Sequence, residues 1–301
     1  EIIILVFALG LTFSLGEEWQ INSYVIHVQM YLSLAFIALF LSLAFSFTYL
    51  HLRSSSSFFS LPLSLPFQFL CDYIPINGLT EGNQAEPAVA MGPNGGFLVC
   101  WRGPGVLADS DDIFVRPFDA NAVPEANDIV VNEFLDNDQR NPRVAALAGG
   151  YILVWESKGL LGDTNRQVCA RILDPNGQAI GPEIRISDAE TECRNADIAT
   201  DSHGRFVVAW LEGKSGYHIK ARVFDANGIA AGPSFRVDTV PPRSVTSPSI
   251  ALHDQGHFII AWDGDPNRAA DDDIHLRQYD PNGLALGGQI MVNTNQVGAQ
   301  R

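Results

Sequence analysis

Basic side chains are scarce in this 301-residue sequence: 19 Lys and Arg stand against 34 Asp and Glu, a formal net charge of −15. A nucleic-acid-binding protein needs a basic footprint for the phosphate backbone, so this balance excludes that class. Cysteine is also scarce, and the four cysteines form no CxxC pair and no zinc-ligand spacing. They are too few for disulfide bonds to be the main source of stability in a chain of this length. A hydrophobic content of 47% in turn excludes a disordered acidic chain.

The usual catalytic motifs are absent as well. The sequence has no GxSxG elbow, no HExxH and no glycine-rich phosphate loop. The sialidase Asp-box, Ser-x-Asp-x-Gly-x-x-Trp, is not matched, because Asp201 lies three residues before Gly204 and Trp210 lies six after it. The histidines are scattered over predicted turns and strands, where we expect them to be exposed or hydrogen-bonded. These absences favour a protein without catalytic activity.

Charge is almost missing from the first quarter of the chain, where Arg53 is the one charged residue between positions 19 and 71. Residues 30–50 are free of charge and long enough to span a bilayer as a helix. We therefore predict that residues 1–73 form an apolar N-terminal segment with a candidate transmembrane helix at 30–50. Ser54–Leu70 consists almost entirely of Ser, Phe, Leu and Pro, which is also typical of translated non-coding sequence. A non-native reading frame upstream is thus the alternative.

After residue 73 the sequence repeats. Four tryptophans, each at the end of an apolar run, are separated by 54, 55 and 52 residues: Trp101, Trp155, Trp210 and Trp262. Each is followed by an Arg-x-x-Asp element: Arg116–Asp119, Arg171–Asp174, Arg222–Asp225 and Arg277–Asp280. Three of these elements run into Asp-Pro/Ala-Asn-Gly, which is typical of a tight turn. The first reads Asp119-Ala120-Asn121-Ala122, without the glycine.

The apolar runs within each repeat are rich in β-formers and too short for helices, which predicts strands buried on both faces. Four short strands per repeat of about 52 residues are typical of a β-propeller blade, and stacked neighbours are needed to bury its faces. Such repeats are too short for seven-stranded sandwiches. We predict an all-β fold, a β-propeller of four-stranded blades over residues 74–301. The expected blades span approximately 85–141, 142–195, 196–247 and 248–301.

The two ends of the repeat region look like cuts through the pattern. Ile74–Asn77 resembles the last strand of a blade, and Gln300-Arg301 matches Gln139-Arg140, which begins a new blade. We therefore expect a fragment of a larger propeller of about six to eight blades. It would form an incomplete ring of four visible blades with exposed apolar faces.

The repeat string P-x-V-A…F-V-V-x-W…R-x-F-D-x-x-G…V-N-T resembles the repeats of bacterial secreted and cell-surface β-propeller proteins, many of them adhesin-like. The resemblance covers residues 74–301. It implies an extracellular, periplasmic or cell-surface location, membrane-anchored if residues 30–50 span a bilayer. It also implies a carbohydrate or protein ligand at the cell surface.

Residues present in all four repeats are expected to be architectural, because a single active site would not need four copies. Both the Arg-x-x-Asp elements and the tryptophans are therefore predicted to be structural. The unrepeated loops after two of the tryptophans are rich in acids, and several carboxylates in one loop suit calcium. The candidate metal ligands are Asp263, Asp265, Asp271, Asp272 and Asp273, with Asp109, Asp111 and Asp112 as the alternative set. Neither loop matches the twelve-residue calcium motif, so a solvated acidic loop is the competing interpretation. No other cofactor and no catalytic residue is predicted.

Together these patterns predict a non-catalytic extracytoplasmic propeller that serves as a binding or adhesion module. One alternative is a carbohydrate-active propeller enzyme, sialidase-like or lyase-like. Another is a structural subunit docked on a membrane complex through residues 30–50. The enzyme differs from the adhesin in one respect: its unrepeated carboxylates should converge in the axial mouth of the propeller.

Overall fold

The computed structural model describes residues 74–107, 110–159, 164–187, 191–214, 216–239, 247–264 and 273–294, together with the backbone of four short strands upstream. The chain forms two compact units, Glu1–Asp72 and Tyr73–Arg301. In the first unit, β1 (Gln20–Ile21) pairs with β2 (Tyr24–Val25), and β3 (Leu50–Ser54) pairs with β4 (Ser57–Leu61). The candidate helix at 30–50 lies outside the described residues except for Leu50, which begins β3. No helix within the described part of the chain is long and apolar enough to span a bilayer.

The second unit consists of four four-stranded antiparallel sheets, each built from consecutive strands in chain order. The strands are β5 (Ala85–Met91), β6 (Phe97–Pro104), β7 (Asp111–Phe118) and β8 (Ile129–Val130); β9 (Gln139–Leu147), β10 (Gly150–Lys158), β11 (Arg166–Leu173) and β12 (Ile184–Arg185); β13 (Cys193–Thr200), β14 (Phe206–Glu212), β15 (His218–Phe224) and β16 (Phe235–Arg236); and β17 (Ser249–Leu252), β18 (Phe258–Gly264), β19 (Asp273–Tyr279) and β20 (Ile290–Met291). The predicted all-β propeller of four-stranded blades is confirmed. The expected blade limits at 141 and 195 fall inside β9 and β13, respectively.

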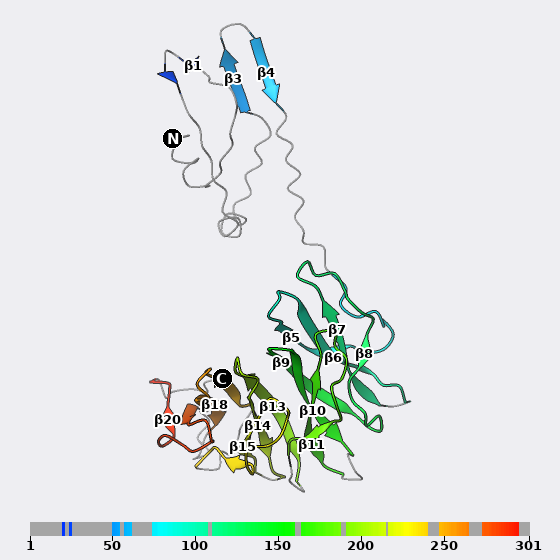
Figure 1. Ribbon diagram of the computed structural model, residues 1–301, viewed down its shortest axis with the longest axis vertical. Coiled ribbons are helices and arrows are strands. Elements are labelled where there is room, and N and C mark those ends of the chain that lie inside the picture. Colours follow the sequence, from blue (N-terminus) through cyan, green and yellow to red (C-terminus); the bar gives the residue numbers. More distant parts are fainter. Residues whose placement is uncertain are drawn as a thin grey trace. The chain divides into compact units, whose positions relative to one another are not determined.

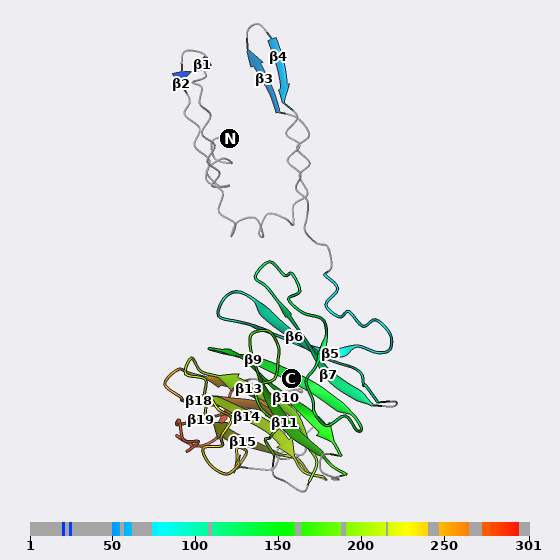
Figure 2. The ribbon, with the colours of Figure 1, turned by 45° about the vertical axis from the view of Figure 1, so that its right-hand side comes forward.

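The four sheets follow one another in chain order, from the green first sheet to the red fourth (Figures 1 and 2). The first strand of each sheet lies beside the first strand of the next: β5 beside β9, β9 beside β13, and β13 beside β17. These first strands are therefore the inner strands of the propeller, and the two-residue fourth strands lie at its outer edge.

The hydrophobic core lies between successive sheets, which explains the uninterrupted apolar runs. In β10, Leu153 and Trp155 pack toward the first sheet, whereas Ile152 and Val154 pack toward the third. Because side chains alternate across a strand, a run of consecutive apolar residues can fill two interfaces at once. The four repeated tryptophans are 0–4% exposed, so their predicted role in blade packing is confirmed.

The repeated Arg-x-x-Asp element is also structural, as predicted. Asp225 Oδ1 accepts the backbone N–H groups two and four residues further on, which holds the turn. Arg222 Nε donates to the carbonyl of Gly232 in its own sheet, and Arg222 Nη1 donates to the carbonyl of Ile186 in the preceding sheet. Equivalent pairs of bonds recur for the other three arginines: Arg116, Arg171 and Arg277.

The two outer sheets differ in how their free faces are covered. Ile76, in the leading segment, packs against the apolar face of the first sheet that includes Trp101, and its carbonyl accepts Arg116 Nη1. Residues 74–77 thus make the outer-strand contact expected of them, although they form no strand. On the fourth sheet, Ile259 and Val292 are 37% and 49% exposed. The expected exposed apolar face is present there.

Candidate functional site

The propeller has two ends with different chemistry. The end at which the inner strands begin is called the loop end. There the second strand of each sheet connects to the third. The turn end is the opposite one, where tight turns such as 92–96 join the first strand to the second. Polar residues that do not recur in every repeat gather at both ends, and the larger group is at the loop end.

Three of the four inner strands contain a β-bulge near the loop end. A non-glycine residue adopts a left-handed conformation at each bulge: Glu86 at φ 58°, Asn141 at φ 51° and Asn195 at φ 51°. Such conformations cost on the order of 1–3 kcal/mol each, and bulges re-aim side chains next to functional sites. Three strained polar residues on adjacent inner strands therefore make the loop end a candidate functional site.

Two glutamates join these bulges across three sheets. Glu86 Oε2 accepts the backbone N–H of Asn141 at 2.7 Å. Glu156 Oε1 accepts the backbone N–H of Asn195 at 2.7 Å and the side-chain amide of Asn141 at 2.6 Å. The Glu156 residue is 3% exposed, and burial raises the pKa of its carboxyl above the usual range. The pair thus fixes the backbone where the inner strands begin.

Asp197 continues the same pattern into the fourth sheet. Its Oδ2 accepts the backbone N–H of Ile250, on the fourth inner strand, at 2.9 Å. Burial raises the pKa of Asp197, although this hydrogen bond and the positive charge of Arg143 offset part of the effect. Unlike Glu156, Asp197 keeps part of its surface exposed. It is an accessible carboxyl that holds its proton more tightly than an ordinary aspartate.

Guanidinium groups accompany these carboxylates. Arg102 lies 3.5 Å from Glu86 and 2.6 Å from Asp111. Arg166 lies 3.3 Å from Glu192. The loop-end cluster comprises Glu86, Asp111, Asp138, Glu156, Glu192 and Asp197 with Arg102, Arg140, Arg143, Arg166 and Arg194. It offers hydrogen-bond donors, acceptors and titratable carboxyls on adjoining sheets, which suits proton transfer to a bound polar substrate.

These carboxylates do not recur from sheet to sheet. The position after each repeated tryptophan, for example, is Arg102, Glu156, Leu211 and Asp263 in the four sheets. A purely architectural residue would be expected at the same place in every sheet, as the Arg-x-x-Asp element is. The loop end therefore carries carboxylates that are not repeated from sheet to sheet.

The predicted metal ligands have other partners where the structure describes them. Asp112 is fully buried: its Oδ1 accepts the amide of Asn132, and its Oδ2 accepts the backbone N–H of Val106. Asp273 Oδ1 accepts the amide of Asn293 in the same way. Both aspartates thus hold the outer strand of their own sheet, which is an architectural role.

Of the remaining candidates, Asp111 pairs with Arg102, and Asp263 is 6% exposed. The other four lie outside the described residues: Asp109, Asp265, Asp271 and Asp272. Among the residues that the structure describes, no three His, Cys, Asp or Glu side chains are grouped so that they could hold a metal ion. The structure does not bring the described candidates together.

One histidine departs from expectation. His275 is 5% exposed, and neither of its ring nitrogens has a hydrogen-bond partner among the described residues. Its ring lies 6.0 Å from that of Trp262, between the third and fourth sheets. The prediction that each scattered histidine is exposed or hydrogen-bonded is wrong at this position.

Glu86, Asn141 and Asn195 escaped the sequence analysis because each looks like a polar interruption of an inner strand. A signal was nevertheless present. Arg140-Asn141 and Arg194-Asn195 are the same dipeptide at the same place in two repeats, and Glu86 takes the equivalent place in the first. The strand was predicted to be apolar. A polar residue that recurs at its start indicates the bulge.

No protein-family model and no curated protein matches the chain. Among solved structures, it resembles a Penicillium chrysogenum α-L-arabinanase complexed with arabinobiose, with 13% identity over 69% of this chain and 66% of that one and a TM-score of 0.51. It also resembles the Fusarium graminearum GH93 α-L-arabinofuranosidase complexed with arabinobiose, with 11% identity over 73% and 70% and a TM-score of 0.50. A Dyadobacter fermentans protein of unknown function matches with 11% identity over 72% and 71% and a TM-score of 0.51.

At these identities the likeness is one of fold. Two of the three matched structures are an arabinanase and an arabinofuranosidase, each in complex with arabinobiose. The predictions of a non-catalytic adhesion module and of no enzymatic activity are therefore wrong, and the carbohydrate-active alternative is favoured.

Proposed function

We propose that this protein is a propeller enzyme that cleaves glycosidic bonds, with its active site at the loop end. The observation that carries the proposal is the set of unrepeated carboxylates Glu86, Glu156 and Asp197, each of which contacts the inner strand of the next sheet. Glycoside cleavage uses a pair of carboxyl groups, one as proton donor and one ionised. The resemblance to two arabinobiose-bound propellers supports the same chemistry.

Asp197 is the proton donor in this mechanism. A general acid must hold its proton near the working pH, and burial raises the pKa of Asp197 in that direction. The backbone N–H of Ile250 fixes Oδ2 of the carboxyl that would protonate the departing sugar oxygen. The residue is partly exposed, which gives a substrate access to it.

Glu86 is the second carboxylate of the pair. Its Oε2 accepts the N–H of Asn141 and lies 3.5 Å from Arg102, and both contacts stabilise negative charge. A carboxylate held in this way can stabilise the positive charge that develops on the sugar ring in the transition state. Glu86 belongs to the first sheet and Asp197 to the third, so the second inner strand lies between them.

Glu156 is a positioning residue. At 3% exposure it is too buried to touch a substrate, but its Oε1 holds both Asn141 and Asn195. It thereby fixes the bulged backbone at Asn141, which donates to Glu86, and at Asn195. Asp197 follows Asn195 by two residues and is fixed with it.

We further propose a neutral polysaccharide as substrate and an extracytoplasmic site of action. The formal charge of −15 repels anionic polymers, and neutral oligosaccharides are what the two matched enzymes hold. The likeness of the repeats to bacterial secreted and cell-surface proteins supports the location.

The test is release of reducing sugar from neutral polysaccharides, beginning with arabinan. Asp197→Asn and Glu86→Gln should each lower kcat by about 100-fold or more. Asp254→Asn is the matched control, because Asp254 lies at the turn end, where it accepts the backbone N–H of Ser202. Unchanged turnover in both site variants, or no cleavage of any neutral glycan by the unaltered protein, would overturn the proposal.

A further inference from the structure

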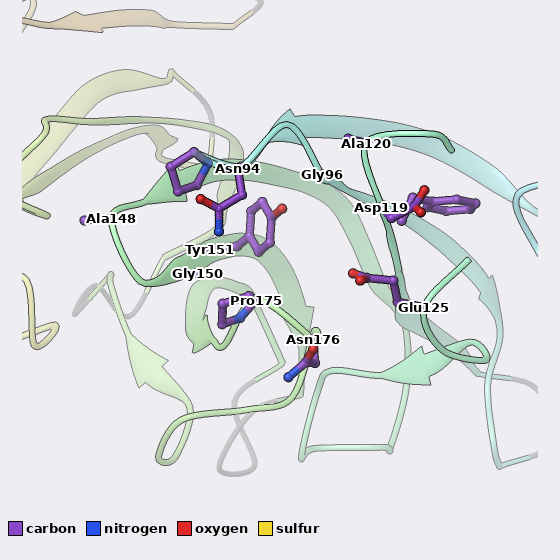
Figure 3. A pocket seen from close by; sticks show the side chains of 13 residues that line it. Asn94, Gly96, Asp119, Ala120, Glu125, Ala148, Gly150, Tyr151, Pro175 and Asn176 are labelled. Atoms are coloured by element: carbon purple, nitrogen blue, oxygen red, sulfur yellow. The ribbon is translucent and has the colours of Figure 1, made fainter. Parts of the chain in front are cut away.

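A second hollow lies at the turn end, between the first and second sheets. Its volume is about 250 Å³, and it is lined by turns of both sheets: residues 92–96, 118–125, 148–151 and 175–176. Figure 3 shows side chains from these turns around it. The hollow is at the opposite end of the propeller from the loop-end cluster and shares no residue with it.

Glycines keep this space open. At the corresponding place in the third sheet, Arg205 pairs with Asp201 at 2.7 Å and reaches the carbonyl of Asp254 in the fourth sheet. In the first sheet, that position in the turn is occupied by Gly96. A Cβ on Gly92 would lie 2.6 Å from the hydroxyl of Tyr151, so a side chain there would close the hollow.

Tyr151 supplies a hydroxyl that the packing of the sheets does not require. Its position is phenylalanine in the other three sheets: Phe97, Phe206 and Phe258. The Tyr151 residue is 4% exposed and belongs to the core between the first two sheets, so the edge that carries the hydroxyl faces the hollow (Figure 3). Burial and the charge of Glu125 raise the pKa of Tyr151, which keeps the hydroxyl protonated as a donor.

Acceptors and further donors face this hydroxyl. The carboxylate of Glu125 points toward Tyr151 from the opposite side of the hollow, and the Asn94 amide lies beside the tyrosine ring (Figure 3). Asn176 lines the lower side, from the second sheet. The residues that line the hollow therefore include a phenol, two amides and two carboxylates, of which Asp119 also accepts backbone N–H groups of its own turn.

We propose that this hollow binds a single neutral sugar unit, separately from catalysis at the loop end. Adjacent sugar hydroxyls both donate and accept hydrogen bonds, so they can pair with a carboxylate, amides and a phenol together. A metal ion is the less favoured ligand, because the described residues contain no group of three His, Cys, Asp or Glu side chains there. The inference does not depend on the proposed glycosidase activity.

The test is calorimetric titration of the full chain with monosaccharides, beginning with arabinose, galactose and glucose. Tyr151→Phe removes the hydroxyl alone and installs the residue that the other three sheets use. We expect it to weaken sugar binding by about tenfold or more, with an unchanged melting temperature and unchanged release of reducing sugar. Glu125→Gln should weaken binding in the same direction, whereas Asp254→Asn should not.

Binding stoichiometry separates this site from the loop end. In Asp197→Asn protein, which retains substrate without turnover, two sugar sites should be found, and one should remain after Tyr151→Phe is added. If the proposed glycosidase site does not exist, one site should be found and Tyr151→Phe should abolish it. The proposal is overturned if Tyr151→Phe binds every sugar as well as the parent, or if no sugar binds at millimolar concentration. It is also overturned if calcium alone raises the melting temperature of the parent but not that of Tyr151→Phe.

Discussion

Arg222 Nη1 donates a hydrogen bond of 3.2 Å to the backbone carbonyl of Ile186, which connects the third sheet to the outer edge of the second. The outer strands are two residues long, so their own ladders hold them weakly. The arginine adds hydrogen bonds to those of the short outer strand. Its Nε donates at the same time to the carbonyl of Gly232, just before the outer strand of its own sheet. The repeated guanidinium is thus a clamp between sheets.

Replacing Arg222 with alanine should therefore destabilise the fold. The variant loses both hydrogen bonds to backbone carbonyls. It also loses the cation–π contact of the guanidinium, which lies 5.7 Å from the centre of the Phe224 ring. We expect a loss of about 1–3 kcal/mol in the free energy of unfolding, measured by urea denaturation. Lys214→Ala, at an exposed position, is the control and should change stability by less than about 0.5 kcal/mol. An Arg222→Ala protein as stable as its parent would show that the clamp is dispensable.

The first turn of the repeat series carries a residue that the other three avoid. Ala122 has φ 61°, where the equivalent positions are Gly177, Gly228 and Gly283. An L-residue in this left-handed region pays a steric cost that glycine does not. Ala122→Gly should therefore raise the free energy of unfolding by about 1 kcal/mol. The reverse change in a matched turn, Gly228→Ala, should lower it; a gain in stability from Gly228→Ala would contradict the argument.

The buried carboxyl of Glu156 should make stability depend on pH in a defined direction. Its pKa is raised mainly by burial, so its contribution to stability is present at low pH and is lost as pH rises through the folded-state value. Glutamine cannot ionise, yet its oxygen can still accept from Asn195. Glu156→Gln should therefore gain stability relative to its parent between about pH 4 and pH 7.

Urea denaturation of both proteins at the two pH values measures this difference, because all other titrating groups cancel. Glu81→Gln, at an exposed position, is the control and should show a constant difference. If the advantage of Glu156→Gln shrinks as pH rises, the ionised carboxylate is the favoured form in the folded protein.

The sequence was sufficient for the architecture because the architectural residues repeat. Trp155 and Arg222 have counterparts in every sheet, and their spacing alone predicts stacked four-stranded blades. Asp112 and Asp273 also hold one repeat position, opposite Asn132 and Asn293, but the acidic runs around them concealed it. Sequence reasoning consequently assigned them to metal binding.

The loop-end site could not be predicted from the sequence, because it depends on backbone geometry. An extra residue in an inner strand shifts the register, and Asn141 and Asn195 take left-handed conformations as a result. A sequence pattern of alternating faces does not reveal which polar residue is redirected toward the neighbouring sheet. Glu156 directly follows the core residue Trp155, and the sequence analysis assigned it no role.

The buried thiols should be inert in the folded protein. Burial raises the pKa of Cys100 and of Cys193 to about 12, and it raises the pKa of Cys169 as well. The reactive thiolate is therefore rare at pH 8, and the sulfur atoms are shielded by the sheets. Iodoacetamide followed by peptide mapping should find these three cysteines unmodified until urea unfolds the chain. Alkylation of Cys169 in the folded protein at the rate of a free thiol would contradict this.

The exposed face of the fourth sheet should make the protein self-associate. The positions equivalent to Ile259 in the first three sheets, Leu98, Ile152 and Val207, are 0–1% exposed, because each packs against the next sheet. Ile259 is 37% exposed, and Ile290 and Val292, on the far side of β19 in the same sheet, are 52% and 49% exposed. A contiguous apolar face of this kind is a common site of association.

Sedimentation velocity over a range of concentrations should therefore detect dimers or larger species, and Ile259→Lys should shift the distribution toward monomer. The substitution places a charge at the centre of the apolar face without removing a buried side chain, so its effect on folding should be small. Ile229→Lys is the matched control: Ile229 is 65% exposed, but it lies in a turn of the third sheet rather than on that face. If Ile259→Lys sediments like its parent while the parent associates, the contact must involve another surface. In that case the apolar side chains of the fourth sheet are not what holds the copies together.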